Sequence, residues 1–334
     1  MSSATALDQV RIVLRADANR AIGHGHVVRC KALATELIEL GAQCQLVGRL
    51  PEGVDGLGID EGLPSSEEPN ATLDFAPDIV VMDLYAPDAA QIEAWRSASS
   101  MSVAIDDSHP HFEFAVDLLI NPSLNPQTRH EPTPTTEYLA GPGFLLLRRG
   151  FEGTSVRQIR KSVESILVCF GGSDPFDFTP RVAQWLAGSV PNVILAVGSG
   201  YPDSGALEER AQQLGVAVVV GADIPTLMSE ADVGVFAAGT LAYEAAAFGL
   251  PSILVSLNEP QRLDAEYLED SGAAKHLTSS QLSAENLNEC LTSLRSPIDR
   301  EVMSRAGRSL VDGGGARRVA EHIAALWHER GGRT

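Results

Sequence analysis

Acid/base chemistry is first suggested by the segment from Arg15 to Arg29, which carries an aspartate, two histidines and three arginines. An apolar run precedes it and a helical pattern follows, so Gly23 and Gly25 stand in a turn from a strand to a helix. Such a turn lets an anionic ligand approach backbone N–H groups. Asp17 near the strand end and His26 at the helix start can meet across it. The helix N-terminus favours the neutral imidazole, which can accept a proton.

The other polar residues of this turn have two readings each. Arg15 and Arg29 either pair with carboxylates or offset the charge of a ligand phosphate. His24 is expected to be a solvated loop residue. The glycine spacing does not fit the G-x-G-x-x-G fingerprint of dinucleotide-binding proteins, which argues against a nicotinamide dehydrogenase.

Two segments in the second half of the chain are suited to a phosphate group. Gly171, Gly172 and Ser173 follow an apolar run, and their backbone N–H groups and hydroxyl can face an anion. The alternative is a tight turn that caps the next helix. Gly239 and Thr240 open a helix N-terminus suited to a diphosphate, with Glu244 about one turn further on. That glutamate either accepts ribose hydroxyls or is an ordinary surface residue.

Carboxylates also follow two apolar runs of the first half, at Asp83-Leu84-Tyr85 and Asp106-Asp107-Ser108-His109. We expect these residues to line the same crevice as Asp17 and His26, unless they only cap the following helices. No His, Cys and Asp cluster has the spacing of metal ligands, so no metal is predicted.

Alternating apolar runs and helical patterns must position these groups. The runs that predict strands are 10–14, 44–47, 79–82, 101–105 and 118–120, then 165–170, 193–197, 217–220, 233–237 and 252–255. Helices are predicted at 27–40, 241–248 and 316–328, and residues 122–160 read as loop and crossover. The pattern predicts two doubly wound α/β domains, 1–150 and 151–334, with a ligand cleft between them. The last helix is free to pack back on the first domain.

The bulk composition excludes several classes of protein. The net charge of −19 argues against nucleic acid or an anionic membrane as a partner. No apolar run is long enough for a transmembrane helix, and no secretory signal is visible at the N-terminus, so a cytoplasmic protein is expected. The four cysteines have no C-x-x-C spacing and read as reduced thiols in or near the core. The oligomeric state is left open.

Taken in order, the motifs resemble those of one family. R-A-D-A-x(4)-I-G-x-G-H-x-x-R, D-x-Y, I-D-D, G-G-S-D, A-x-G-T-x-x-x-E-A-x-x-x-G-x-P and D-G-x-G-A-x-R-V are similar to the UDP-sugar hydrolases of the pseudaminic acid pathway. Those enzymes act on UDP-2,4-diacetamido-2,4,6-trideoxy-β-L-altropyranose, and spore coat polysaccharide proteins are their relatives. The G-x-P segment is shared with MurG-like glycosyltransferases of the two-domain GT-B fold.

The resemblance implies a GT-B fold, with UDP held mainly by the C-terminal domain. It implies that His26 is the catalytic base and that Asp17 lies beside it. The substrate- and nucleotide-binding residues that it implies are Arg15, Gly25, Arg29, Tyr85, Gly171, Gly172, Ser173, Ile224, Gly239, Thr240, Glu244 and Gln261. In this assignment the diphosphate lies at the two glycine segments, the ribose on Glu244 and the uracil near Ile224.

The sequence departs from the family at three places. Leu84 replaces a frequent histidine, Gly239-Thr240 replaces Ser-Ser, and two residues separate Asn258 from Gln261. The expected activity is cofactor-free hydrolysis of a UDP-activated amino or deoxy sugar, with water attacking the anomeric carbon and inverting it. One alternative is a transferase that moves the sugar to a small acceptor. Another is a nucleotide-sugar-binding module without turnover.

Overall fold

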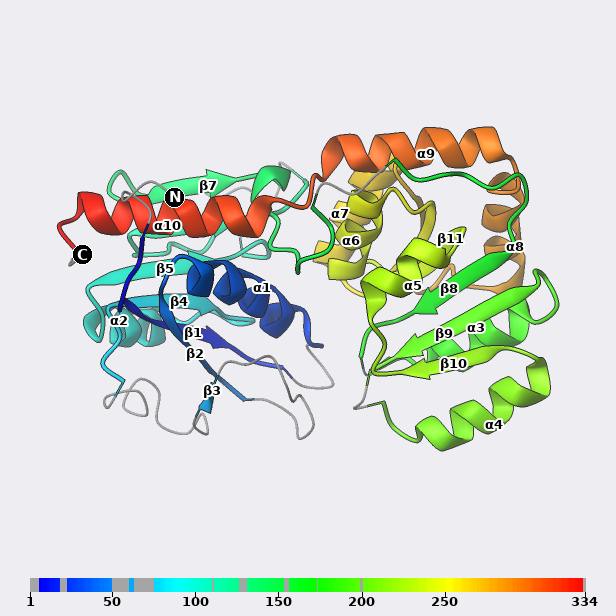
Figure 1. The fold of residues 1–334 in the computed structure, drawn as a ribbon, viewed down its shortest axis with the longest axis horizontal. Coiled ribbons are helices and arrows are strands. Elements are labelled where there is room, and N and C mark those ends of the chain that lie inside the picture. Colours follow the sequence, from blue (N-terminus) through cyan, green and yellow to red (C-terminus); the bar gives the residue numbers. More distant parts are fainter. Residues whose placement is uncertain are drawn as a thin grey trace. The chain divides into compact units, whose positions relative to one another are not determined.

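The computed structural model describes residues 6–18, 23–49, 60–62, 75–109, 111–125, 131–152, 156–172, 174–198 and 201–332. For residues 60–62 it describes the backbone only. The chain forms two compact units. The first comprises Met1–Arg149 with Gly313–Thr334, and the second comprises Gly150–Asp312. The C-terminal segment therefore belongs to the first unit, although it follows the second along the chain (Figure 1).

Within the described residues, the first unit is built on a seven-stranded sheet in the order β3-β2-β1-β4-β5-β6-β7. All neighbouring strands in it are parallel. Their bounds are β1 Arg11–Ala16, β2 Gln43–Val47, β3 Asp60–Gly62, β4 Ile79–Asp83, β5 Met101–Ile105, β6 Leu118–Asn121 and β7 Glu137–Ala140.

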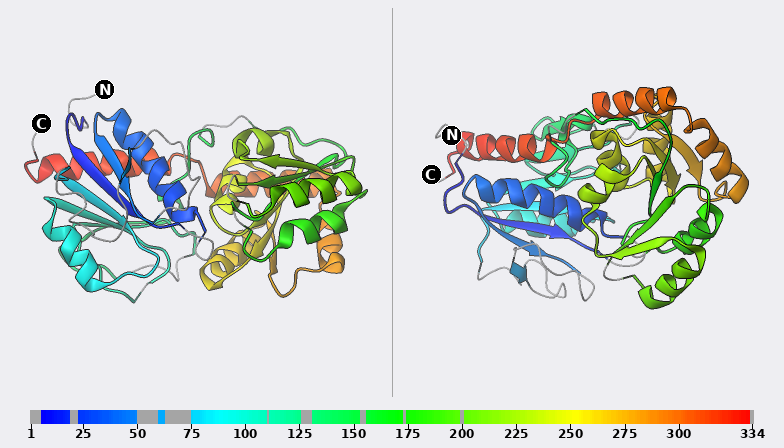
Figure 2. Two further views of the ribbon diagram at one scale, coloured as in Figure 1. Left: turned by 90° about the horizontal axis from the view of Figure 1, so that it is seen from below. Right: turned by 45° about the vertical axis from the view of Figure 1, so that its right-hand side comes forward.

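Helices cover both faces of this sheet, which explains why its central strands are largely apolar. On one face, a core cluster joins β1, β4 and β5 to α1 (Gly25–Glu39) and α10 (Gly315–Glu329). On the other, Val80 and Met82 pack with Trp95 of α2 (Ala89–Ser97). Figure 2 (left) shows α1 and α2 on opposite sides of the sheet.

The second unit repeats the design with a six-stranded sheet among its described residues, in the order β10-β9-β8-β11-β12-β13. The strands are β8 Ser165–Cys169, β9 Asn192–Val197, β10 Ala217–Val220, β11 Val233–Ala237, β12 Ser252–Ser256 and β13 Lys275–Thr278. The helices are α3 Phe178–Leu186, α4 Ser204–Leu214, α5 Ile224–Glu230, α6 Thr240–Phe248, α7 Glu259–Asp270, α8 Ala284–Ser293 and α9 Pro297–Leu310.

Each sheet has one point where the strand order reverses, and this point is where open α/β sheets bind ligands. In the first sheet the chain runs outward from β1 to β2 and β3, then returns to place β4 on the other side of β1. In the second sheet β8 and β11 have the same relation. The carboxyl ends of β1 and β4, and of β8 and β11, are therefore the places to look for chemistry.

The doubly wound parallel architecture and most of the predicted strands are confirmed, with bounds that differ by one or two residues. The interpretation of residues 122–160 as loop and crossover missed two elements. This stretch contains β7 and a 3-10 helix, η5 (Pro142–Phe144). Since β7 is a four-residue edge strand with half-exposed side chains, it has no continuous apolar run to reveal it.

The four cysteines are free thiols at buried or half-buried positions, as predicted. None of the helices within the described ranges combines the length and the apolar character that crossing a membrane would require.

The close packing of α10 on η5 gives a stability prediction. A Cβ atom added to Gly315 would lie 2.2 Å from the carbonyl oxygen of Leu145, a backbone atom that cannot move aside freely. Alanine is the better helix former by about 1 kcal/mol, so a loss in Gly315→Ala reports this clash. We expect the first unit to lose about 1–3 kcal/mol of unfolding free energy.

The measurement is urea unfolding followed by tryptophan fluorescence in a Trp185→Phe background. The remaining tryptophans, Trp95 and Trp327, both belong to the first unit. Gly143→Ala is the matched control, because a Cβ there meets no atom within 4 Å, and we expect a change within about 0.5 kcal/mol. Equal losses in the two variants would contradict the packing argument.

Candidate active site

The first site is a histidine–carboxylate pair at the strand-order reversal of the first sheet. His26 is the second residue of α1, which follows β1, and Asp83 is the last residue of β4. The Nδ1 atom of His26 lies 2.7 Å from Oδ1 of Asp83. The His26 side chain is 18% exposed, whereas Asp83 is wholly buried. The imidazole is thus anchored at one nitrogen and reachable from outside.

The pair fixes the tautomer of the imidazole. A carboxylate only accepts hydrogen bonds, so Nδ1 of His26 must carry the proton that it donates to Asp83. The other contact of Nδ1, to Nη2 of Arg29, is longer at 3.3 Å. Nε2 is then left with its lone pair. A neutral histidine held in this way is suited to take a proton, and the carboxylate stabilises the imidazolium that forms.

Arg29 locks the carboxylate in place from the same helix. Its Nε and Nη2 atoms each donate to Asp83 at 2.6 Å, and its Nη1 donates to Asp107 after β5 at 2.5 Å. Burial opposes the charge on Arg29, but Asp107 and Asp83 hold its pKa above the ordinary value. The guanidinium therefore serves two carboxylates of the protein, which favours the structural reading of this residue over phosphate binding.

The buried Asp83 is ionised because of its partners. Burial alone would raise the pKa of this carboxyl group, but the charges of Arg29 and His26 lower it to about 2. Arg29 donates two hydrogen bonds to the group and His26 one, which satisfies the charge-assisted bonding that a buried carboxylate needs.

The predicted pairing of His26 with Asp17 was wrong, since Asp83 takes that place. Asp17 accepts hydrogen bonds from Nη1 and Nη2 of Arg15 at 2.7 and 3.0 Å, and from the backbone N–H of Arg49 at 2.8 Å. It thus faces the end of β2, on the other side of β1 from β4. Burial opposes its charge, yet Arg15 and Arg49 keep the pKa of Asp17 below its ordinary value.

Two further predicted residues border the pair. Gly25 is the first residue of α1. Tyr85 is 53% exposed, and its ring stands edge-on to His26 with the centroids 6.0 Å apart. An exposed aromatic ring beside an anchored base can contact a ligand. His24 is only partly solvated, because its Nδ1 atom is buried and burial lowers its pKa.

In the second unit, the predicted phosphate segments lie at the other strand-order reversal. Gly171 has φ of 87°, so the chain turns sharply after β8, and Gly172 lies against Gly198 after β9. Ser173 is outside the described residues. Asp174 accepts hydrogen bonds from the backbone N–H groups of Phe178 and Thr179 at 3.0 and 2.7 Å. The protein's own carboxylate therefore occupies the N-terminus of α3.

The N-terminus of α6 differs in this respect. Gly239 precedes Thr240, the first residue of this helix, and no side chain of the described residues caps it. A Cβ added to Gly239 would lie 3.6 Å from Nε2 of Gln261, so the amide of Gln261 borders the same helix end. Oε1 of Gln261 accepts from the backbone N–H of Leu257 at 3.0 Å, which holds that amide in place. Three predicted residues are thus brought together.

The two remaining predicted residues lie deeper. Glu244 is 0% exposed on α6, so it is not an ordinary surface glutamate, and a ligand hydroxyl would reach it only after neighbouring side chains move. Ile224 begins α5 and is 8% exposed. Across the described residues, no three His, Cys, Asp or Glu side chains are placed to hold a metal ion.

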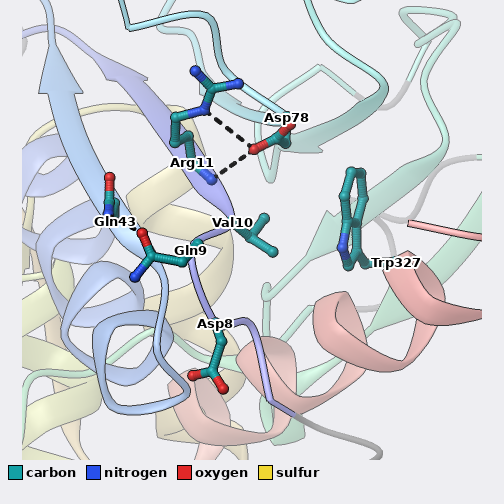
Figure 3. Close-up of a pocket in the computed structure, with 7 residues that line it drawn as sticks. All are labelled: Asp8, Gln9, Val10, Arg11, Gln43, Asp78 and Trp327. Carbon is teal, nitrogen blue, oxygen red and sulfur yellow. Dashed lines mark hydrogen bonds and ion pairs between the residues drawn. The ribbon is translucent and has the colours of Figure 1, made fainter. Parts of the chain in front are cut away.

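One cavity of about 420 Å³ lies away from this chemistry. It is in the first unit, at the amino-terminal ends of β1 and β2, and is lined by Asp8, Gln9, Val10, Arg11, Gln43, Asp78 and Trp327 (Figure 3). Since His26 and Asp83 are at the carboxyl ends of the strands, this cavity is at the opposite edge of the sheet.

The sequence pattern predicted that Asp83 and Asp107 follow strands, but it did not identify Asp83 as the hydrogen-bond partner of His26. A stronger signal was present in the spacing of His26 and Arg29. Three residues apart on a helix, they share one face and present a donor pair to a single carboxylate.

The buried Asp83 cluster predicts a pH dependence of stability. Because its pKa is lowered on folding, Asp83 stabilises the protein above its unfolded pKa of about 3.9. That contribution, about 2 kcal/mol for a shift to about 2, is lost as the pH falls through this window. Asp83→Asn should cost about 3–5 kcal/mol at pH 7, because Arg29 and His26 lose a charged partner.

The measurement is urea unfolding of the Trp185→Phe background with and without Asp83→Asn, from pH 7 down to pH 3. We expect the difference between the two proteins to shrink as the pH falls below 4. Asp78→Asn is the control, because the Arg11–Asp78 ion pair is half-exposed, at 40% and 30%, and ion pairs in contact with solvent contribute about 1 kcal/mol or less. A difference that stays constant with pH would refute an ionised Asp83.

Comparison with known proteins shows similarity to glycosyltransferase-related sequences and structures. Residues 166–318 match the glycosyltransferase family 28 C-terminal domain. The spore coat polysaccharide biosynthesis protein SpsG of Bacillus subtilis is 30% identical over 204 residues, which cover 58% of this chain and 60% of SpsG. An uncharacterized protein of Methanocaldococcus jannaschii is 22% identical over 277 residues, 76% of this chain and 57% of that protein. The chain thus matches less than two thirds of the length of either relative.

Solved structures agree on the fold. MurG of Acinetobacter baumannii has a TM-score of 0.64 at 17% identity, with 94% of this chain and 99% of MurG covered. The spinosyn rhamnosyltransferase SpnG, complexed with thymidine diphosphate, has a TM-score of 0.61 at 14% identity, with 96% of this chain and 99% of SpnG covered. The protein has the GT-B fold seen in MurG, is homologous to SpsG over part of its length, and matches the glycosyltransferase family 28 C-terminal domain over residues 166–318.

Proposed function

We propose that this protein hydrolyses a UDP-activated amino or deoxy sugar of the pseudaminic acid type, releasing the free sugar and UDP. The observation that carries the proposal is the pair of His26 and Asp83. It presents an anchored, partly exposed base at the strand-order reversal of the first sheet. The catalytic residue is His26, and Asp83 is its positioning residue.

The reaction needs one base and no cofactor. Nε2 of His26 takes a proton from water while the water oxygen forms a bond to the anomeric carbon. The bond from that carbon to the diphosphate oxygen breaks, and UDP leaves with the electron pair on the face opposite to the attack. The anomeric configuration is therefore inverted. Asp83 stabilises the imidazolium until it loses its proton to solvent.

The charges of the first unit suit a sugar better than a diphosphate. Arg29 is paired with Asp83 and Asp107, and Arg15 with Asp17, so these cations are matched by carboxylates of the protein. We therefore assign the sugar to the first unit, with Gly25 and Tyr85 beside it. In this proposal Asp17 and Arg15 have a structural role, as an ion pair at the carboxyl end of β1.

The diphosphate is assigned to the second unit. The N-terminus of α6 offers backbone N–H groups at Gly239 and Thr240, and an anion is favoured there by the helix dipole. Gln261 borders that end, and the turn at Gly171 and Gly172 follows β8 at the same strand-order reversal. Ser173, which the sequence adds to this phosphate segment, lies outside the described residues. Glu244 for the ribose and Ile224 for the uracil complete the proposal. The family 28 domain supports the assignment, since it spans all of these residues of the second unit.

A glycosyltransferase is the second candidate, and a specific observation favours it. The matching domain is that of a glycosyltransferase family, and the structurally similar SpnG is a rhamnosyltransferase. In this version His26 deprotonates a hydroxyl or amine of a small acceptor instead of water. The two candidates share the base, the positioning residue and the leaving group.

The role of His26 is tested by His26→Ala. Because positioned general-base catalysis contributes about 10²–10⁴-fold, we expect kcat for a UDP-sugar to fall by at least a hundredfold, with the affinity for UDP unchanged. His322→Ala, a histidine on α10, is the control and should keep full turnover. A folded His26→Ala protein that binds UDP and keeps wild-type turnover would remove His26 from the mechanism.

Hydrolysis is distinguished from transfer by the fate of the oxygen. In heavy-oxygen water without an acceptor, we expect one labelled oxygen in the free sugar, because water attacks carbon, and none in UDP. Mass spectrometry of both products is the measurement. Label in UDP would mean attack at phosphorus. Turnover that appears only after an acceptor is added would establish the transferase.

A further inference from the structure

Arg29 changes the character of the pair formed by His26 and Asp83. The Oδ1 atom of Asp83 accepts from Nδ1 of His26 at 2.7 Å and from Nη2 of Arg29 at 2.6 Å. The Oδ2 atom accepts from Nε of Arg29, also at 2.6 Å. Arg29 therefore binds both oxygens of the carboxylate in the bidentate geometry of a strong ion pair, and His26 shares one of these oxygens with it.

This sharing weakens the support that Asp83 can give to a protonated His26. In a histidine–carboxylate pair, the negative charge stabilises the imidazolium that forms when the ring takes a proton. Here the positive charge of Arg29 is bonded to the same carboxylate, and its Nη2 atom lies 3.3 Å from Nδ1 of His26. Asp83 and Arg29 together carry no net charge. As an isolated pair, they would leave the imidazolium without a compensating charge.

Asp107 supplies a further negative charge from the neighbouring strand. It is the second residue after β5, and its side chain is 20% exposed. Its Oδ2 atom accepts from Nη1 of Arg29 at 2.5 Å, and its Oδ1 atom accepts from the hydroxyl of Ser108 at 3.0 Å. Asp83 and Asp107 are two carboxylates on one guanidinium. The group behind the ring of His26 therefore carries a single net negative charge.

The other ionisable groups that the structure describes around His26 are bonded to partners of their own or uncharged. Two cationic or basic side chains each have a carboxylate partner, in the pairs Arg15–Asp17 and His109–Asp106. Burial lowers the pKa of His24, which favours its neutral form. Burial also raises the pKa of the Cys30 thiol well above its ordinary value, so this neighbour of Asp83 is uncharged. Tyr85 meets His26 with the edge of its ring. Asp107 is thus the second carboxylate that hydrogen bonds join to His26.

We propose that Asp107 is a positioning residue of the reaction, which acts on His26 through Arg29 and supplies the charge that stabilises the imidazolium. The inference rests on the proposed function, because it takes His26 to be the base. With Asp107 in place, the uptake of a proton by His26 makes the cluster of these residues and Asp83 neutral. Without the charge of Asp107, the same step would leave a net positive charge in a largely buried site, which is costly.

The test is the pH profile of kcat/KM for hydrolysis of UDP-2,4-diacetamido-2,4,6-trideoxy-β-L-altropyranose by the wild type and by Asp107→Asn. The acid limb of this profile reports protonation of the base in the free enzyme. We expect Asp107→Asn to move the acid limb to lower pH by about half to one unit, because the imidazolium loses a nearby negative charge. A weaker base is also a slower catalyst, so the plateau should fall about three- to tenfold.

Two variants separate the charge of Asp107 from its place in the packing. Asp107→Glu keeps the charge, and we expect its acid limb at the wild-type pH even if the plateau falls. Glu113→Gln removes one negative charge from an exposed side chain elsewhere in the first unit and should change neither the limb nor the plateau. A purely structural role of Asp107 would lower the plateau in both Asp107 variants and leave the limb in place.

Further measurements keep the test decisive if a variant is slow or unstable. Where turnover is too slow to follow, NMR titration of the His26 ring gives the same comparison of midpoints. Should Asp107→Asn not fold, Asp107→Ser makes the same change of charge with a smaller side chain that can still accept a hydrogen bond from Arg29.

The outcomes separate the two proposals. If the wild type hydrolyses the UDP-sugar and the acid limb of Asp107→Asn stays in place or moves to higher pH, the role of Asp107 is overturned and the proposed function stands. If the wild type does not turn over this substrate, the proposed function fails, and the role of Asp107 in the reaction fails with it.

Discussion

The buried charge of Asp83 is the constraint on which the first unit depends. A carboxylate with no exposure must be matched by donors, and α1 supplies them from two positions on one face, His26 and Arg29. The requirement fixes the start of α1 against the end of β4. It also sets the tautomer of His26, because the carboxylate accepts from Nδ1. Stability and chemistry therefore rest on the same three side chains, and Asp107 extends the network to β5 through Arg29.

Much of the fold could be predicted because the central strands are buried on both faces. Such strands are continuous apolar runs, as in β4 and β5, where every residue is buried. The edge strands do not carry this signal. The partner of His26 was missed for a different reason. Asp17 and Asp83 both follow a strand, and Asp17 is much nearer in sequence. Only the strand order, with β4 beside β1, decides which carboxylate lies under the helix start.

The second unit shows a related limit of sequence reasoning. A glycine-rich turn followed by an aspartate predicts either a ligand-binding site or a helix cap. The two cannot be told apart from the sequence, because both use the same residue types. The structure shows that Asp174 caps α3, whereas the start of α6 has Gly239 and the amide of Gln261 beside it. A helix N-terminus that is capped by a carboxylate of the protein is not free for a ligand. The spacing of residues in the sequence does not show which N-termini are capped, because capping depends on where the side chain lies.

The same pair of His26 and Asp83 serves hydrolysis and transfer equally well, since a base that deprotonates water also deprotonates a hydroxyl. The difference between the two reactions must therefore lie in what stands opposite Nε2. Polar groups that bind only the sugar leave that place to water, whereas a transferase must bind a second substrate there.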